Sequence, residues 1–273
     1  MPAAALALTL AAAFVHAVWN LLLAREPDPE AATAVALVAA VALFAPVVPF
    51  VWDVDARVWP FVVVTSLLQL LYFALLAAAY RRADLSFVYP IARGLAPVLV
   101  LVVGAVAVSQ SASAAQVLGV LVIAAGVLLV RGPKGHARAR DGALALAVAG
   151  CIAAYTLVDK HGIAYAAPIV YLELSMIPAA LGYLGGFRLL AGSRRLRAQR
   201  LAVPALAGVL SFVAYVLVLA ALEQASAASV AAVRETSVVI ATALAVPLLR
   251  ERVGIRRLAG AVLVVFGIVF LTL

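Results

Sequence analysis

Two arginines lie deep inside apolar segments, and their side chains are the strongest candidates for chemistry in this chain. Arg93 lies within the apolar run 85–108, and Arg234 lies within the apolar run 226–249. A guanidinium inside a membrane segment costs about 2.5 kcal/mol or more unless it faces water or the interior of a helix bundle. Guanidinium groups bind carboxylates and phosphates through paired hydrogen bonds. The two arginines therefore predict a polar binding site for an anionic group between membrane helices.

Other polar and aromatic residues accompany the arginines at helical spacing. His16, Trp19 and Asn20 lie at positions i, i+3 and i+4, so they share one face of a helix, and Glu235 directly follows Arg234. We expect the substrate to contact the following set of residues: Arg93, Arg234, Glu235, His16, Trp19, Asn20, Tyr89, Tyr155, Asp159, Tyr72 and Tyr215.

Glu235 and Asp159 are also the candidates for carrying a coupling proton, because a carboxyl group in a membrane interior can change its charge. Each has a structural interpretation as well. Glu235 could pair with an arginine and join two parts of the fold, and the sequence Asp159-Lys160-His161 could be a helix end that enters water. The tyrosines could serve only for packing. The sequence leaves these alternatives open.

The composition restricts the fold class to polytopic helical membrane proteins. Hydrophobic residues make up 67% of the 273 residues, which is more apolar surface than a soluble domain of this length can bury. The apolar runs are continuous, whereas the strands of a membrane barrel alternate in polarity. The net charge of +8 resides in short loops, so we expect no nucleic-acid partner. Cys151 is the single cysteine, no metal-ligand spacing or catalytic motif occurs, and we expect no enzyme activity, metal or cofactor.

Charged, proline and glycine residues divide the chain into ten expected transmembrane helices. The longest polar linker, 131–141, separates them into two groups of five. The expected domains are a first five-helix repeat at 1–131, a basic linker at 132–141 and a second repeat at 142–273. The expected helices are 3–24, 31–52, 59–80, 85–108, 113–131, 142–158, 167–190, 201–222, 226–249 and 254–273.

The two halves resemble copies of each other. A shift of 141 positions places Arg93 on Arg234, and it also places Gly119 on Gly260 and Gly126 on Gly267. A five-helix copy that follows another must enter the membrane in the opposite orientation. The expected fold is therefore an all-α membrane protein of two inverted repeats, an arrangement that many secondary transporters share.

The basic residues predict the orientation. With ten spans, the loops on one side hold nearly all of them, and the loops on the other side hold only Arg57 and Lys160. The positive-inside rule then places the basic loops in the cytoplasm and both termini outside, in a plasma (inner) membrane. The basic set is Arg25, Arg81, Arg82, Arg131, Lys134, Arg138, Arg140, Arg194, Arg195, Arg197, Arg200, Arg250, Arg252, Arg256 and Arg257.

Three stretches resemble the drug/metabolite transporter superfamily, of the EamA type. The C-terminal stretch LAVPLLRERVGIRRLAGAVLVVFGIVFL is similar to the last two helices of that family, with Glu251 before the final helix. YRRADLSFVYPIARGLAPVLV and HAVWN resemble the junction of its third and fourth helices and its first helix. The resemblance implies secondary transport through a central cavity lined by helices one, three and four and helices six, eight and nine. Gln110 departs from the pattern, because the first repeat often has glutamate there.

The expected function is therefore alternating-access transport of small polar, amino-acid-like metabolites, with export as the direction that the resemblance implies. In this interpretation the arginines bind a carboxylate and Glu235 or Asp159 meets an amine. The alternatives are a phosphate or phosphonate compound, or an organic cation such as a quaternary amine bound by aromatic rings. A membrane enzyme or a scaffold that transports nothing are further alternatives. The expected partners are a small-molecule substrate, the lipid bilayer and the coupling proton; the sequence does not determine the oligomeric state.

Overall fold

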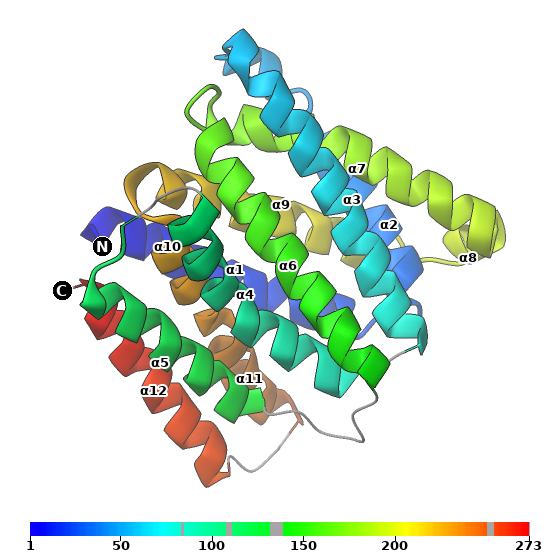
Figure 1. Cartoon of the computed structure of the whole chain (residues 1–273). Coiled ribbons are helices and arrows are strands. Elements are labelled where there is room, and N and C mark those ends of the chain that lie inside the picture. Colours follow the sequence, from blue (N-terminus) through cyan, green and yellow to red (C-terminus); the bar gives the residue numbers. More distant parts are fainter. Residues whose placement is uncertain (83–84, 108–110, 132–138, 250–253, 273) are drawn as a thin grey trace.

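The computed structural model describes residues 1–82, 85–107, 111–131, 139–249 and 254–272 and is helical throughout these ranges (Figure 1). Helices account for 87% of the structure, and the described residues form no strand. The helices are α1 (Ala3–Leu23), α2 (Pro29–Phe44), α3 (Trp59–Arg82), α4 (Leu85–Ala107), α5 (Ala114–Arg131), α6 (Ala139–Gly162), α7 (Pro168–Ala191), α8 (Ser193–Arg197), α9 (Ala202–Gln224), α10 (Ala227–Arg234), α11 (Thr236–Leu249) and α12 (Ile255–Thr272), with the short 3-10 turns η1 (Val48–Phe50) and η2 (Ala56–Val58).

Seven helical segments in the described ranges are long and apolar enough to cross a membrane. They are Ala3–Leu23, Pro29–Phe50, Ala56–Ala79, Arg140–Gly162, Pro168–Ala191, Ala202–Gln224 and Ile255–Thr272. Two shorter apolar helices, Ile91–Ala107 and Ala114–Val130, correspond to the fourth and fifth expected spans. These segments confirm the expected all-helical membrane class, and the count of ten spans stays a prediction.

The expected ninth helix, 226–249, is not continuous. It is interrupted at Glu235, where α10 ends and α11 begins. The Glu235 N–H donates to the carbonyl of Ala232, three residues back, whereas a regular α-helix bonds four residues back. The Thr236 hydroxyl donates to the Val233 carbonyl. These bonds form a tightened turn directly after Arg234.

The expected end of the sixth helix at residue 158 is also wrong. Helix α6 continues to Gly162, so Asp159 lies within it and is fully buried. The interpretation of 159–161 as a helix end entering water does not hold, because three hydroxyl groups described below satisfy the Asp159 carboxylate in the interior.

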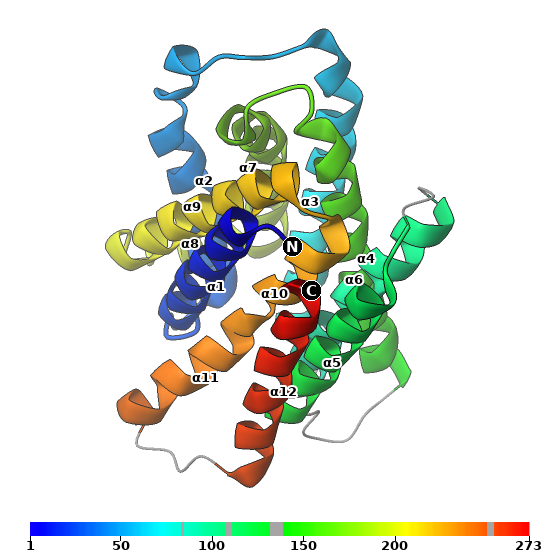
Figure 2. The same cartoon turned by 90° about the vertical axis from the view of Figure 1, so that its left-hand side faces the viewer.

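Helices α5 and α12 pack against each other at glycines (Figures 1 and 2). A Cβ on Gly126 would lie 2.7 Å from the Gly260 oxygen, and one on Gly119 would lie 2.9 Å from the Gly267 oxygen. This register makes the two helices antiparallel. A shift of 141 positions along the sequence converts each of the two glycine contacts into the other.

Gly126→Val should lower the free energy of unfolding by about 1–3 kcal/mol, because the new side chain forces the two backbones apart. Gly150→Val is the matched control, since a Cβ at Gly150 on α6 would meet nothing within 4 Å. Thermal unfolding of the detergent-solubilised protein measures both. Equal effects of the two substitutions would contradict a tight crossing of α5 and α12.

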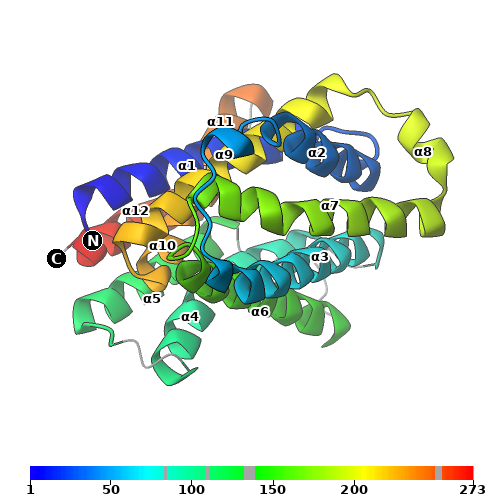
Figure 3. The ribbon, with the colours of Figure 1, turned by 90° about the horizontal axis from the view of Figure 1, so that it is seen from above.

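The remaining helices enclose the centre of the molecule. Figure 3 shows α1, α2 and α9 along one side of the bundle and α3 and α6 along the other. Helix α1 packs on α9, α3 packs on α6, and α7 lies against α2 and α3. Helices α2 and α9 approach closely at Gly208, because this residue has no side chain. A Cβ there would lie only 2.0 Å from the Ala36 carbonyl oxygen. These contacts bring polar residues of several helices to a common centre.

At one end of the bundle, the α1–α2 connection is linked to α8 by an ion pair. Arg195 donates from Nε and Nη2 to the two Asp28 oxygens, at 2.6 Å each, and Glu30 accepts a further bond at 3.2 Å. Asp28 also caps α2 by accepting the Ala31 N–H. Partial burial raises the pKa of Asp28, but the bonds from Arg195 and Ala31 outweigh it and the net pKa is lowered.

Asp28→Asn should cost up to about 1 kcal/mol of stability, because it keeps a capping side chain and removes the charge. Since the folded-state pKa of Asp28 is lowered, the contribution of this pair is complete above about pH 4. It is lost as the pH falls through the lower folded-state value. Unfolding of wild type and Asp28→Asn between pH 7 and pH 3 checks this: the difference between them should vanish in acid, and a constant difference would contradict the assignment.

The opposite end of the bundle is closed by connecting segments. The Asp55 N–H donates to the Tyr165 carbonyl at 2.8 Å, and the Ala167 N–H donates to the Asp53 carbonyl at 3.3 Å, so the α2–α3 connection lies on the α6–α7 turn. Lys160 donates to the Leu222 carbonyl between α6 and α9. The Met1 amino group donates to the Leu271 carbonyl at 2.7 Å, and both termini lie together at this end (Figure 1).

Candidate functional site

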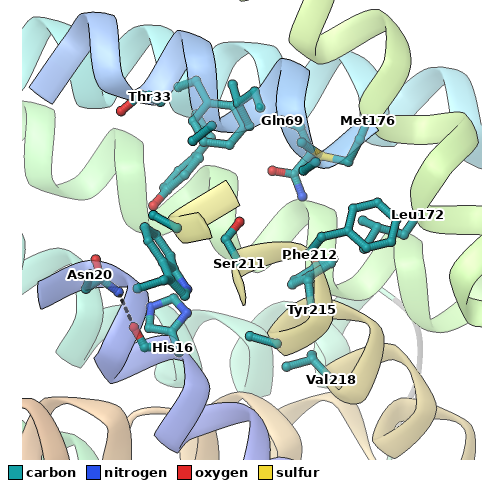
Figure 4. Close-up of a pocket in the computed structure, with 18 of the residues that line it drawn as sticks. His16, Asn20, Thr33, Gln69, Leu172, Met176, Ser211, Phe212, Tyr215 and Val218 are labelled. Carbon is teal, nitrogen blue, oxygen red and sulfur yellow. Dashed lines mark hydrogen bonds between the residues drawn. The ribbon is translucent and has the colours of Figure 1, made fainter. Parts of the chain in front are cut away.

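A cavity of about 120 Å³ lies between the helices and reaches toward the end that carries α8. Its walls come from the later turns of α1 and α3, from most of α2, from the middle of α9, from the first turns of α7, and from single residues of α4, α6 and α10. Figure 4 shows His16 and Asn20 on one side of the space and Leu172, Phe212 and Tyr215 on another. Eight of the eleven expected substrate-contacting residues line it: His16, Trp19, Asn20, Tyr72, Arg93, Tyr155, Tyr215 and Arg234.

Arg93 is compensated by neighbouring groups. Its Nε lies 3.2 Å from the Glu235 carboxylate, and its Nη2 contacts His16 Nε2 and lies 3.4 Å from the Ser237 hydroxyl. A guanidinium can only donate, so His16 Nε2 accepts and the imidazole is neutral. The ion pair joins α4 of the first half to the α10–α11 break of the second. This contact agrees with the structural interpretation in which Glu235 pairs with an arginine.

Arg234 is in a different situation, although its burial is similar. It is 3% exposed and lines the cavity, and its closest carboxylate oxygen, on Glu235, is 3.9 Å from its Nε. Its Nε and Nη2 have no hydrogen-bond partner among the described residues, and neither does Nε1 of Trp19, which also lines the cavity. A buried guanidinium with so little compensation is costly for the folded protein. The cavity wall therefore holds a cation and hydrogen-bond donors without acceptors.

Glu235 does not line the cavity. Side chains of adjacent residues in a helix point about 100° apart. Arg234 lines the cavity, whereas Glu235 is fully buried beside Arg93. The sequence places Arg234 and Glu235 next to each other. It does not reveal that Arg93, from another helix, lies closer to the Glu235 carboxylate than Arg234 does.

Asp159 also lies behind the cavity wall. Its carboxylate accepts hydrogen bonds from the Thr65 hydroxyl at 2.6 Å, the Tyr171 hydroxyl at 2.9 Å and the Tyr215 hydroxyl at 2.5 Å. These donors come from α3, α7 and α9, so one carboxylate on α6 connects four helices. Tyr215 lines the cavity and donates to Asp159, so one side chain separates the Asp159 carboxylate from the cavity.

Tyrosines form a continuous aromatic wall. Tyr155 on α6 meets Tyr72 on α3 at a centroid distance of 6.1 Å and Tyr215 on α9 at 5.9 Å, both edge to face. His16 and Trp19 form another edge contact at 4.8 Å on α1. The side chain of Tyr89, the remaining expected residue, lies outside the described part of the structure.

Several lining residues were not in the set expected to contact substrate. Most are apolar, and they come largely from α2, α7 and α9, where nothing in the sequence distinguishes a cavity face from a lipid or packing face. Gln69 shares a helical stripe with Tyr72, and Ser211 shares one with Tyr215, but a stripe of this kind is as typical of packing as of a site. These additional residues include Thr33, Leu37, Gln69, Leu172, Met176, Ser211, Phe212 and Val218. The described residues contain no cluster of three side chains that could hold a metal ion.

Comparison with known proteins gives a family and a fold. The EamA-like transporter family model matches residues 142–273, the same range as the expected second repeat. None of the curated proteins matches the chain. A solved crystal structure matches with a TM-score of 0.77 at 17% sequence identity, covering 100% of this chain and 97% of the other, which shows that the fold is shared.

Proposed function

Because residues 142–273 belong to the EamA-like transporter family, part of the drug/metabolite transporter superfamily, we propose that this multi-pass membrane protein is a secondary active transporter of small polar metabolites. The observation that carries the proposal is the central cavity, which lies among eight helices and is lined by the incompletely compensated Arg234. A site of this kind near the middle of a helical membrane protein is where such transporters bind their substrates.

Alternating access is the mechanism that we propose. It requires the closed end to open while the other end closes, and repeats of opposite orientation supply two equivalent gates. The α5–α12 glycine contacts, which exchange under the shift of 141 residues, support two inverted repeats at 1–131 and 142–273 joined by the linker 132–141. Ten spans follow from this proposal. Most of the linker lies outside the described residues.

The orientation and direction are part of the proposal. The cavity reaches toward the end that carries Arg25 and the arginines of α8, whereas the termini lie at the other end. The positive-inside rule places the basic end in the cytoplasm of a bacterial-type plasma membrane and the termini outside. The cavity then faces the cytoplasm, which supports export.

For the substrate, an anionic amino-acid-like metabolite fits the arginines, and we propose Asp159 as the coupling-proton site with Glu235 as the second candidate. Asp159 suits this role because it is buried, adjoins the cavity through Tyr215 and connects four helices. The alternative of a phosphate or phosphonate compound is supported by two arginines at the site. The organic-cation alternative draws support from the tyrosine wall alone, since no acidic residue is among the lining residues.

Blocking the cavity tests the proposed function. In proteoliposomes that contain a mixed panel of labelled amino acids, organic anions and amines, the wild-type protein should catalyse exchange of at least one solute. Ser211→Trp, which fills the cavity from α9, should abolish that exchange. Leu206→Trp, on an exposed surface of the same helix, should leave it unchanged. Exchange that survives Ser211→Trp in a folded protein would exclude the cavity as the route.

A further inference from the structure

We infer that the cavity selects an organic monoanion, a single carboxylate on an apolar or aromatic body, and that Arg234, rather than Arg93, is its anchor. The inference rests on the proposed function of the same cavity and replaces the amino-acid-like substrate proposed there with a carboxylate that carries no ammonium group. It also separates two arginines that are equivalent in the sequence.

The first step is the balance of charge at the cavity. Arg93 and Arg234 are both buried there, and the one carboxylate between them, on Glu235, lies closer to Arg93, at 3.2 Å against 3.9 Å. His16 adds no charge, because its Nε2 must accept from Arg93. The two arginines and Glu235 together leave one positive charge, and it resides mainly on Arg234.

The second step is the balance of hydrogen bonds. Arg93 contacts His16, Ser237 and Glu235. Nε and Nη2 of Arg234 and Nε1 of Trp19, all on cavity-lining residues, make no hydrogen bond to the described residues. Nε of Arg93 also makes no hydrogen bond to these residues, but it lies 3.2 Å from the Glu235 carboxylate, whereas the nearest distance from Arg234 to that carboxylate is 3.9 Å. Buried donors without acceptors are rare in folded proteins, and a bound ligand that supplies the acceptors is one explanation for them. A carboxylate supplies up to four acceptor positions and matches the flat guanidinium.

The third step concerns a second charge on the ligand. An ammonium group would need an acidic or otherwise unoccupied acceptor, but no Asp or Glu is among the lining residues. The Asp159 oxygens already accept three hydroxyl hydrogen bonds, and Glu235 is engaged by Arg93. A dianion would leave the site with an uncompensated negative charge. A monoanion satisfies the charge that the protein leaves open.

The walls then indicate the rest of the ligand. Opposite the polar residues of α1, the cavity is lined by Leu172, Met176 and Phe212, together with the edge-to-face Tyr72–Tyr155 pair (Figure 4). Thioether and aromatic groups pack well against rings of varied shape. A carboxylate attached to a flat apolar body fits these surfaces.

Four ring compounds of one skeleton test the inference by thermal shift of the detergent-solubilised full chain: benzoate, benzylamine, zwitterionic phenylglycine and the dianion phthalate. We expect benzoate to raise the melting temperature most. Arg234→Gln should abolish this shift, and Arg57→Gln, at an exposed arginine of the closed end, should retain it. Without ligand, Arg234→Gln should melt at the same temperature as wild type or higher, because it removes a poorly compensated buried charge.

Each other outcome overturns the inference. A larger shift with phenylglycine or benzylamine would mean that the site accepts an ammonium group, and a larger shift with phthalate would mean that both arginines bind anions. A benzoate shift that survives Arg234→Gln would remove Arg234 as the anchor. These results leave the transport proposal standing if Ser211→Trp still blocks solute exchange, whereas loss of that effect would overturn the transport proposal itself.

Discussion

Arg93→Leu should lower the free energy of unfolding by about 3–5 kcal/mol, because it leaves the Glu235 carboxylate buried without its main partner. Glu235 is fully buried, and its other cation, Arg234, lies 3.9 Å away without a hydrogen bond. The substitution also removes the donor to His16 and Ser237. Reversible unfolding in mixed detergent micelles, followed by tryptophan fluorescence, measures the change.

A double-mutant cycle identifies the cause. Arg93→Leu combined with Glu235→Leu should recover much of the lost stability, because a buried ion pair can be replaced by apolar side chains at little cost. Arg234→Leu provides a matched comparison at a similar depth and should not destabilise the protein. If the two single arginine substitutions destabilise equally, or if the double variant loses the sum of both single effects, the proposed difference between the arginines is incorrect.

Asp159→Leu should cost about 3–6 kcal/mol of stability, because the Thr65, Tyr171 and Tyr215 hydroxyls lose their shared acceptor in the interior and each unsatisfied buried group costs about 1–3 kcal/mol. Asp159→Asn is the matched control: it keeps one oxygen acceptor for Thr65 and Tyr171, which both donate to Oδ1, and should cost less. The same unfolding assay compares the two variants. Equal losses in the two variants would contradict the role of Asp159 as a shared acceptor.

The two Asp159 variants also separate a structural role from the coupling role. Asp159→Asn cannot ionise, so solute exchange should persist while accumulation driven by a pH gradient disappears. Gradient-driven accumulation equal to that of wild type would exclude Asp159 as the coupling site. The same measurement on Glu235→Gln would then test the second candidate. A loss of exchange as well as accumulation, in a folded protein, would instead place Asp159 among the groups needed for substrate movement.

The all-helical membrane class could be predicted from the sequence, because long apolar runs indicate membrane spans; the count of ten spans and the orientation stay predictions. The 141-residue shift used these glycines only as evidence for a duplication; their contacts, such as that of Gly126 of α5 with Gly260 of α12, come from the structure. The break at Glu235 could not be predicted. No proline or glycine adjoins it, and its distinguishing feature, the ion pair of Glu235 with Arg93 of another helix, is tertiary.

The candidate site was predictable in part. The charges inside apolar helices predicted Arg93 and Arg234 as site residues, and helical spacing predicted His16, Trp19 and Asn20. All five line the cavity. The difference between the arginines was not predictable, because it depends on the tertiary contact that brings Arg93 of α4 to the Glu235 carboxylate. The apolar wall was not predictable either, since Leu172 and Phe212 have no local feature that separates them from lipid-facing residues.

The most direct test of the central claim is a crystal structure of the protein with 4-bromobenzoate, located by the anomalous scattering of bromine. The account predicts one bromine peak inside the cavity, against the wall formed by Leu172, Met176 and Phe212, with the carboxylate at the Arg234 guanidinium. Crystals of Arg234→Gln should lack this peak. A bromine peak on the lipid-facing surface only, or a carboxylate bound at Arg93 with Glu235 displaced, would contradict the account.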